Sequence, residues 1–443
     1  MTDLTKIFSN FVSQATLQNF NDEMIFFSKM SMIDWCGVAY AAKEEPVSKI
    51  VTKLIEEEQT KGHSKLISNG QEVSAKSAAF VNGTIGHALD YDDTHFLFTG
   101  HPTASAFPTA LALGEELGSS IDEIMLAYMC GVEISTRLGH ILGYSHYNKG
   151  FHQTATSGAF GATLVASKLL KLNAQQIENA LGIVSTRASG LKSQFGTMGK
   201  PFHAGIAASN GIEAAKLSKL GFVSCENGIE CNQGFLKTHA WDGTIPEAAI
   251  NGLGKDFLFP EIKYKFHACC HGLHAFLEAL DELKTKNNFN PDSIEKISIQ
   301  TQPSWLQVCN IDSPKTGLEA KFSYRLTAAM SLHGVDTGRL DSYNDEICFD
   351  EKIVKTRDKV EVIPNDQMTN TEALIELKDG SEIPEWLSYD PNSGKIIAEP
   401  PEDISKLDLK LIIERDGEII VKDLSIEFSI RQALFRKNRI FLK

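Results

Sequence analysis

Residues 157–168 read SGAFGATLVASK, a stretch built largely from glycine, alanine and serine. Small side chains let helix axes approach closely, at a cost in helix propensity from the glycines. The stretch therefore predicts a helix packed tightly inside a bundle. Helix starts are predicted on both sides of it, because Ser120 with Glu123 and Asn173 with Gln176 have the spacing of capping boxes.

After residue 252 the pattern changes from helical spacing to alternation. Alternating apolar residues predict strands, and apolar residues three or four apart predict helices between them. The expected strands are residues 297–300, 360–363 and 373–377, and the expected helices are residues 274–284 and 320–332. We therefore expect residues 1–255 to form a domain that is helical throughout, and residues 256–381 to form an α+β domain.

The end of the chain has the pattern of short antiparallel strands, with turn signals between alternating runs. The segment IPEWLSYDPNSG, which begins at Ile383, resembles the motif of a dystroglycan-type cadherin-like immunoglobulin module. We expect residues 382–430 to be a β-rich, cadherin-like fragment and residues 431–443 to be a basic tail.

Composition and charge exclude several classes of protein. The 443 residues are 42% hydrophobic and 23% charged, which is typical of a globular protein, and the net charge is −14. The sequence has no basic stripe, so no nucleic-acid partner is expected. It begins without a signal pattern, and its longest apolar run, residues 124–132, is too short to cross a bilayer. We expect a cytoplasmic protein with no membrane partner.

Residues 86–102, GHALDYDDTHFLFTGHP, concentrate groups that move protons. The segment holds three aspartates, three histidines and Thr94 within seventeen positions. Carboxylates and imidazoles side by side shift each other's pKa values toward the working pH, as general acid–base catalysis requires. The segment is therefore the first place to look for a catalytic site.

A metal site is not expected. Asp92 and Asp93 are similar to the start of the DDxxD magnesium motif of class I terpenoid synthases, but Phe96 takes the place of its last aspartate. The sequence has no HExxH zinc motif, and its eight cysteines lack CxxC spacing, so reduced thiols are expected. Nucleotide motifs of the GxGxxG and GxxxxGK[ST] types are missing as well, so no cofactor is predicted.

Three more segments carry groups suited to a pocket for anions. His152 precedes the small-residue helix, and a helix N-terminus there would favour an anion, although a lone histidine is more often an ordinary core or surface residue. Lys200, next to a proline and three residues before His203, could clamp a carboxylate, although by itself it is better explained as a solvated loop lysine. Residues 266–274 place three histidines ahead of a helix, where they could line a pocket.

Taken together, five segments resemble the MmgE/PrpD family, which includes 2-methylcitrate dehydratase, cis-aconitate decarboxylase and iminodisuccinate epimerase. The segments are ALDYDDTH…HPTA…FP at 88–108, GFHQT with GAFGATLVASKLLKL at 150–172, GKPFHAGIAASNGIEAAKLSKLGF at 199–222, HACCHGLHA at 267–275 and EAKFSYRLTAAMSLHG at 319–334. They follow the family's order, and the resemblance extends from near the N-terminus to about residue 380.

The resemblance implies a mainly α fold, with a large all-helical domain plus a smaller α+β lid domain and, in this chain, a short β-rich C-terminal segment. It also implies a homodimer that uses no metal and no organic cofactor. The active site is expected between the helical domain and the lid.

The resemblance also assigns site residues. The catalytic candidates are Asp90, Thr94, His101, His152 and Lys200. The candidate substrate-binding residues are His203, His271, His274, Tyr324 and Arg325. Asp92 and Asp93 are expected to support the loop by capping or hydrogen bonding rather than to bind a metal.

Two local differences from the family stand out. The loop between Thr94 and His101 is one residue longer here. The cis-aconitate decarboxylases also use a tyrosine in the helix after the lid strands, whereas the alignment places Arg325 at that position, beside Tyr324. The decarboxylase reaction is therefore not the first choice.

The predicted function is that of a lyase of the dehydratase type, acting on a small di- or tricarboxylate such as a 2-methylcitrate-like substrate. A base removes the proton next to a carboxylate, while Lys200 and His203 hold carboxylates and stabilise the developing charge. Epimerisation of an iminodisuccinate-like dicarboxylate and decarboxylation also pass through a carbanion or enolate next to a carboxylate, and both stay as alternatives. The alternative from another class is a carboxylate-binding protein with a degenerate lid and no catalysis.

Overall fold

The computed structural model describes residues 2–286, 290–370, 372–379, 387–390, 395–398, 406–415 and 418–427. Its internal contacts divide the chain into two compact units, residues 1–292 with 296–377 and residues 293–295 with 378–443. The first unit therefore contains the helical region together with nearly all of the α+β region. Within the described part of the chain, no helix combines the length and apolarity that a membrane span requires.

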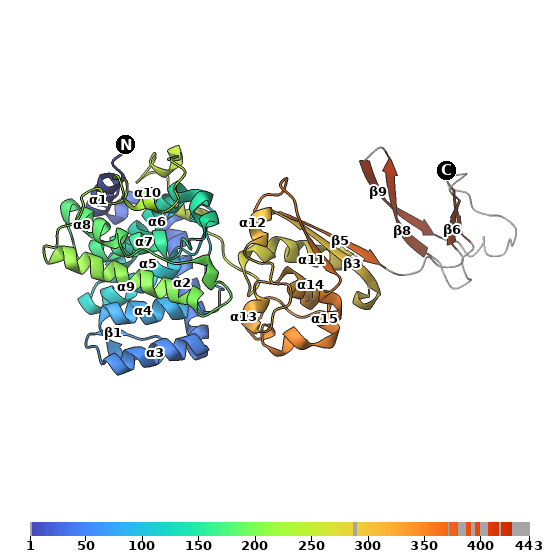
Figure 1. Cartoon of the computed structure of the whole chain (residues 1–443), viewed down its shortest axis with the longest axis horizontal. Coiled ribbons are helices and arrows are strands. Elements are labelled where there is room, and N and C mark those ends of the chain that lie inside the picture. The colour runs from blue at the N-terminus through green and yellow to red at the C-terminus, as the bar shows by residue number, and fades with distance from the viewer. Residues whose placement is uncertain are drawn as a thin grey trace. The chain divides into compact units, whose positions relative to one another are not determined.

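The N-terminal region is a helical bundle (Figure 1). Its helices are α1 (Leu4–Gln14), α2 (Asp22–Ala41), α3 (Pro46–Glu58), α4 (Ala75–Gly86), α5 (Thr103–Leu117), α6 (Ile121–Lys149), α7 (Thr156–Leu169), α8 (Ala174–Ser185), α9 (Gly199–Lys219) and α10 (Phe235–Thr238). A short antiparallel pair, β1 (Ser64–Lys65) and β2 (Glu72–Val73), lies between α3 and α4 in the sequence. Helix α7 packs against α5, α6, α8 and α9, which makes it the centre of the bundle.

The small residues of α7 allow this helix to pack closely against α6. Every residue of this helix except Lys168 is buried. A Cβ added to Gly161 would lie 2.8 Å from the Cβ of Ser135 on α6, and one added to Gly131 of α6 would lie 2.6 Å from the carbonyl oxygen of Gly161. The two helices therefore approach closely enough that glycine is needed on both sides, which confirms the predicted tight packing.

Replacing Gly161 with alanine is expected to lower the free energy of unfolding by about 1–3 kcal/mol, because the new methyl group overlaps Ser135. Gly37 on α2 is the matched control, since a Cβ there meets no atom within 4 Å. Gly37→Ala should raise the free energy of unfolding by up to about 1 kcal/mol through helix propensity alone. Urea unfolding of the two variants checks both signs, and equal effects would contradict the packing argument.

Local signals placed several helix ends correctly. Both predicted capping boxes are present, with Ser120 accepting from the N–H of Glu123 and Asn173 accepting from the N–H of Gln176. The expectation that residues 1–255 are helical throughout is wrong for residues 221–255, where the structure has turns, short 3₁₀ segments and the four-residue α10. Six glycines and a proline in that stretch favour turns over a continuous helix.

The α+β region holds a three-stranded sheet with helices. Its elements are α11 (His274–Lys286), β3 (Ile294–Thr301), α12 (Pro303–Leu306), α13 (Gly317–Ala320), α14 (Tyr324–Leu332), α15 (Glu351–Arg357), β4 (Val360–Pro364) and β5 (Ala373–Asp379). The strand order is β4-β3-β5, and β3 runs parallel to β4 with Ile297 opposite Val360. All three predicted strands and the helix predicted from His274 are confirmed, as is the mainly α fold class.

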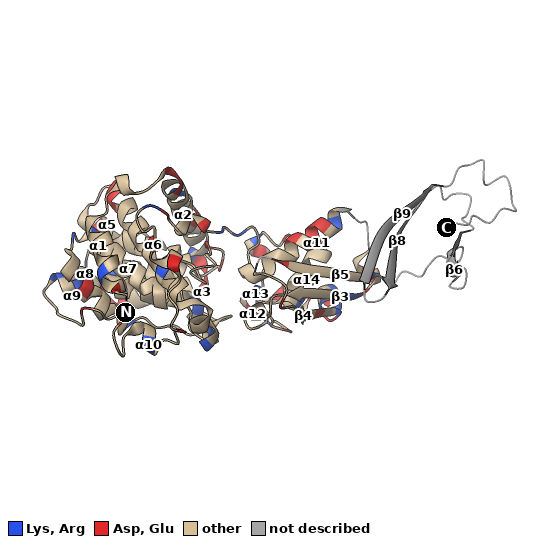
Figure 2. Cartoon of the chain, turned by 90° about the horizontal axis from the view of Figure 1, so that it is seen from above, with Lys and Arg blue, Asp and Glu red and all other residues tan. Residues whose placement is uncertain are grey.

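The helix expected at residues 320–332 is split. Helix α13 ends at Ala320, and α14 begins at Tyr324 because the Ser323 side chain accepts from the N–H of Leu326 as an N-cap. The break leaves Lys321 between two helices, and its side chain is only 5% exposed. Acidic residues lie along α11, while basic residues are spread over many elements (Figure 2).

The second unit contains two antiparallel pairs, β6 (Leu387–Asp390) with β7 (Lys395–Ala398) and β8 (Lys406–Arg415) with β9 (Glu418–Glu427). These strands agree with the expected β-rich segment. The turn signals at residues 391–392 and 416–417 and the basic tail at residues 431–443 lie outside the described residues. The cadherin-like character and the domain boundaries stay predictions.

A buried ion pair fixes the chain as it leaves the bundle. The Nε of Arg137 on α6 lies 2.6 Å from Oε1 of Glu133, and both side chains are fully buried. Arg137 donates to the carbonyl oxygens of residues 248, 251 and 256, and Glu133 accepts from the N–H groups of residues 258 and 259. All of these charges are satisfied by backbone, so the segment that leads to Lys265 is firmly attached to α6.

Candidate active site

The loop after α4 carries a residue in an uncommon backbone conformation. Asp90 has φ +53°, in the left-handed region that costs energy for residues other than glycine. Its side chain is almost fully buried, and its Oδ1 pairs with the Nζ of Lys200 and lies 3.2 Å from the Nζ of Lys265. Burial alone would raise the pKa of Asp90, but the two ammonium groups hold that pKa well below its ordinary value. Asp90 is therefore a buried carboxylate between two cations.

Asp92 joins two histidines. The Nδ1 of His87 lies 2.9 Å from each carboxylate oxygen of Asp92, and the Nδ1 of His101 lies 3.3 Å from Oδ2. The other ring nitrogen of His101 lies 3.5 Å from Oδ1 of Asp90, so this imidazole stands between the two carboxylates. Burial lowers the pKa of His101 below 6.5 and that of His87 to about 4, against the opposing effect of Asp92. Both rings are neutral at pH 7 and able to accept a proton.

A second imidazole pair comes from two other elements. His152 lies one turn before α7, and its Nδ1 is 3.0 Å from the Nδ1 of His203 on α9. The helix begins at Thr156 rather than beside His152, and the carbonyl oxygen of His152 accepts from the N–H groups of residues 155 and 156. Burial, together with the neighbouring His203 and Lys200, holds the pKa of His152 well below 6.5. His152 is therefore also a neutral base near Lys200.

Thr94 contacts residues from the α+β part of the chain. Its backbone exchanges two 2.8 Å hydrogen bonds with Lys263, and its Oγ1 lies 2.6 Å from the Nδ1 of His271. The ring of His271 stacks on His274 with centroids 4.6 Å apart. Burial lowers the pKa of His271 to about 3 and that of His274 to about 2, so both rings are uncharged.

The extra residue in the loop before His101 is absorbed in a tight turn. His95 and Gly100 pair through their backbones, and Thr99 takes a left-handed φ of +53°. The N–H of His101 then donates to the Oγ1 of Thr154, which lies two residues after His152. The longer loop therefore still brings His101 to Asp90 and Asp92.

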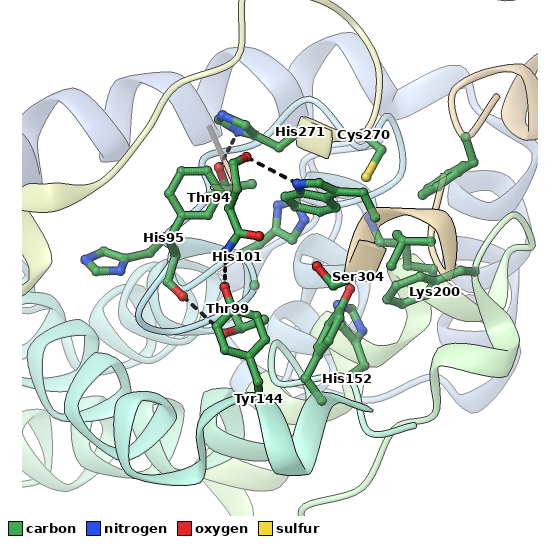
Figure 3. A pocket seen from close by; sticks show the side chains of 18 residues that line it. Thr94, His95, Thr99, His101, Tyr144, His152, Lys200, Cys270, His271 and Ser304 are labelled. Atoms are coloured by element: carbon green, nitrogen blue, oxygen red, sulfur yellow. Dashed lines mark hydrogen bonds between the residues drawn. The ribbon is translucent and has the colours of Figure 1, made fainter. Parts of the chain in front are cut away.

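A pocket of about 640 Å³, a volume that includes its open mouth, collects these side chains. Figure 3 shows Thr94, His101, His152 and Lys200 around the same space, with His271 beside Thr94. The lining residues are Thr94, His95, Phe96, Thr99, Gly100, His101, Tyr144, Tyr147, His152, Phe195, Lys200, Cys270, His271, Ser304, Trp305, Val308, Phe322 and Asn370. The mixture of apolar walls with a few polar groups is typical of small-molecule sites.

The other candidates lie behind the wall or away from it. Asp90, His203 and His274 contact lining residues from behind. Tyr324 is fully buried, and its hydroxyl group bonds to Thr301 and to the carbonyl oxygen of Gly272. The guanidinium of Arg325 pairs with Asp312 at 2.7 Å. The structure therefore does not bring Tyr324 or Arg325 to the pocket.

Two groups of this site, His87 and Lys265, were not among the candidates from the sequence, and Asp92 was expected only to support the loop. His87 and Asp92 belong to the dense segment 86–102, but their pairing depends on the loop conformation. Lys265 is fully buried, is 175 residues away from Asp90 in sequence and still donates to its carbonyl oxygen at 2.5 Å. Its one signal in the sequence is its position just before the histidine segment at 266–274. Asp93 accepts from the hydroxyl of Thr103, which agrees with its expected supporting role.

Ligand atoms of His87, Asp90, Asp92 and His101 lie within 4.8 Å of one another, a spacing that a metal ion could use. Two ammonium groups already neutralise Asp90, and their charges oppose a divalent cation there. Oδ2 of Asp90 and Nε2 of His87 are buried without a hydrogen-bond partner among the described residues. These atoms are able to bond to a substrate or to water. The expected absence of a metal stays a prediction.

A helical bundle and an α+β region that together enclose a lysine–carboxylate–imidazole pocket define a class of proteins. The chain matches the MmgE/PrpD N-terminal domain over residues 6–246 and the MmgE/PrpD C-terminal domain over residues 267–411. It therefore belongs to the MmgE/PrpD family. The second match reaches residue 411 and so includes part of the segment with the cadherin-like motif.

Curated relatives carry one recurring name. The chain is similar to the cis-aconitate decarboxylase-like protein oryM of Aspergillus oryzae, with 26% identity over 313 residues, which is 67% of this chain and 65% of that protein. It is 28% identical to the cis-aconitate decarboxylase of Aspergillus terreus, over 67% of this chain and 64% of that protein. It is 30% identical to the human cis-aconitate decarboxylase, over 53% of this chain and 50% of that protein. The chain spans less than two thirds of the length of these relatives.

Proposed function

We propose that this protein is a lyase that acts on a small di- or tricarboxylate by moving a proton next to a carboxylate group. The observation that carries the proposal is one pocket that combines a buried ammonium group, Lys200, with neutral imidazoles, His101 and His152. The ammonium group suits an anionic substrate, and the imidazoles suit proton transfer near neutral pH.

The chemistry follows from these positions. His101 or His152 accepts the proton from the carbon next to a carboxylate, and the electron pair of that C–H bond forms an enolate. Lys200 and the hydroxyl of Thr94 are placed to stabilise the negative charge. In a dehydration the protonated imidazole then gives its proton to the departing hydroxide, and in an epimerisation it returns the proton to the opposite face of the carbon. In a decarboxylation no C–H proton is removed: the electron pair comes from the bond to the departing carbon dioxide, and an imidazole that has taken up a proton from solvent delivers it to that carbon.

The names of the relatives favour decarboxylation of cis-aconitate over the dehydration predicted from the sequence. Dehydration of a 2-methylcitrate-like substrate stays as the second candidate reaction, because neither Tyr324 nor Arg325 lines the pocket. The homodimer and the cytoplasmic location also stay proposals. Light scattering of the purified protein tests the first, and fractionation of the source cells tests the second.

Deuterium transfer distinguishes catalysis from binding. We expect the purified full chain, incubated in D₂O with 2-methylcitrate, citrate, cis-aconitate or iminodisuccinate, to introduce deuterium into one of them. NMR detects the label, and released carbon dioxide or an alkene product identifies the reaction. His140→Gln is the matched control, because His140 lies on α6 and does not line the pocket. Measurable binding without deuterium in any compound would contradict the proposal and favour a carboxylate-binding protein.

A further inference from the structure

Two lysines from the α+β side hold consecutive backbone carbonyls of the site loop. The Nζ of Lys321 donates to the carbonyl oxygen of Leu89 at 2.6 Å, and the Nζ of Lys265 donates to that of Asp90 at 2.5 Å. These two carbonyl groups lie on either side of the Cα atom of Asp90, whose backbone has the left-handed conformation. A strained conformation of this kind persists only where its surroundings hold it. The two charge-assisted hydrogen bonds are such a restraint.

Lys321 is not part of the pocket. It lies at the end of α13, it is 5% exposed, and it does not line the pocket. Its Nζ is 5.7 Å from the ring centroid of Tyr343. A buried ammonium group without a carboxylate partner at ion-pair distance among the described residues is costly, so its hydrogen bond to Leu89 needs an explanation.

We infer that Lys321 is a positioning residue, which holds Leu89 so that Asp90 keeps its left-handed backbone and presents its carboxylate to Lys200. This inference rests on the proposed function, in which Lys200 binds the substrate. Lys321 acts through Asp90 and touches neither substrate nor reacting atoms.

The charge state of Lys321 gives the inference a measurable signature. Burial lowers the pKa of Lys321 from 10.5 to about 8, and the charge of Lys265 acts in the same direction. Asp90, Glu45 and Cys269 oppose this shift. Asp90 faces Lys321 from the site loop, and Glu45 faces it from the turn before α3. Lys265 and Cys269 face it from the segment after residue 263. Above about pH 8 the ammonium group loses its proton, and the restraint on Leu89 weakens.

Three variants of the full chain test this role. Lys321→Met should lower kcat by about 100-fold with a smaller change in KM, because a misplaced catalytic group costs about that much. Lys321→Arg keeps its charge at every accessible pH, so it should restore much of kcat and move the alkaline limb of the pH profile upward from about pH 8. Lys168→Met is the matched control, because Lys168 also caps backbone carbonyls, those of residues 12, 13 and 15, but lies outside the pocket. It should lower Tm and leave the pH profile unchanged.

A crystal structure of Lys321→Met separates this inference from the proposed function, because it needs no substrate. We expect Asp90 to leave the left-handed region and its carboxylate to move away from Lys200. If Asp90 keeps its φ and its ion pair, Lys321 is not a positioning residue, whatever the activity. If the alkaline limb of Lys321→Arg stays where it is in the wild type, the inference fails as well. A wild-type protein that is inactive on every carboxylate, combined with a displaced Asp90 in the variant, overturns the proposed function alone.

Discussion

Replacing Lys200 with methionine is expected to lower kcat/KM by about 10²–10⁴-fold, the usual contribution of one catalytic group. Lys200 is the ammonium group that lines the pocket, and its Nζ lies 5.4 and 5.3 Å from the ring centroids of Phe195 and Phe322. A methionine side chain packs well beside aromatic rings, so the fold should survive. Lys265 also remains 3.2 Å from Asp90, so that buried carboxylate keeps one cation.

The matched control for Lys200 lies on the same helix. Lys216 of α9 pairs with Glu116 at 2.5 Å and is partly exposed, so Lys216→Met removes one lysine and one ion pair without touching the pocket. Steady-state kinetics on the substrate identified by deuterium transfer, together with circular dichroism, compares the two variants. Full activity in a folded Lys200→Met variant would remove Lys200 from the proposed mechanism.

Acidification from pH 7 to pH 4 is expected to remove several kcal/mol of stability. Six buried histidines have pKa values that burial lowers from 6.5 to about 4 or below: His87, His95, His146, His203, His271 and His274. Because the unfolded chain takes up these protons near pH 6.5 and the folded chain does not, unfolding gains protons as the pH falls. The stabilisation is complete above pH 6.5 and is lost as the pH falls through the folded pKa values. One such shift corresponds to about 3 kcal/mol.

Four carboxyl groups oppose this trend. Burial and the neighbouring Asp92 raise the pKa of Asp34 to about 7, so its contribution is complete below about pH 4 and is lost as the pH rises through 7. Burial also raises the pKa values of Asp93, Glu133 and Glu230 above their ordinary values, so these groups act in the same direction. The six histidines outnumber these carboxyl groups. The net expectation is an unfolding midpoint in urea that falls steeply between pH 6.5 and pH 4.

Single histidine variants check the cause. His146 bonds to the carbonyl oxygen of His239 at 2.6 Å and to the hydroxyl of Thr156 at 2.9 Å, so His146→Gln should make the free energy of unfolding less dependent on pH. His63 is exposed, so His63→Gln serves as the control that replaces a histidine outside the core. A protein equally stable at pH 4 and pH 7 would show that the buried rings accept protons without unfolding.

Local sequence patterns predicted much of the helical and strand content. The capping boxes, the small-residue helix α7 and the three strands of the α+β region depend on residues close together in the chain. The errors occurred where local signals conflict. Ser323 caps a new helix inside an apolar helical pattern, and glycines break the region after α9 into turns.

The candidate site was predicted in part. Five of the residues that the resemblance suggested lie around one pocket in the structure: Thr94, His101, His152, Lys200 and His271. The resemblance also suggested Tyr324 and Arg325, whose side chains bond outside the pocket, Tyr324 to the carbonyl oxygen of Gly272 and Arg325 to Asp312. The roles of all these residues stay predictions until variants are measured.

The sequence by itself determined which segments become helices and strands, because capping, periodicity and glycine content act over a few residues. Only the tertiary structure decided the electrostatics of the site. Asp90 is charged because Lys200 and Lys265, 110 and 175 residues away in sequence, reach it inside the protein. The histidines are neutral because packing removes their water. Both effects depend on burial and on distances between remote residues, which no local pattern encodes.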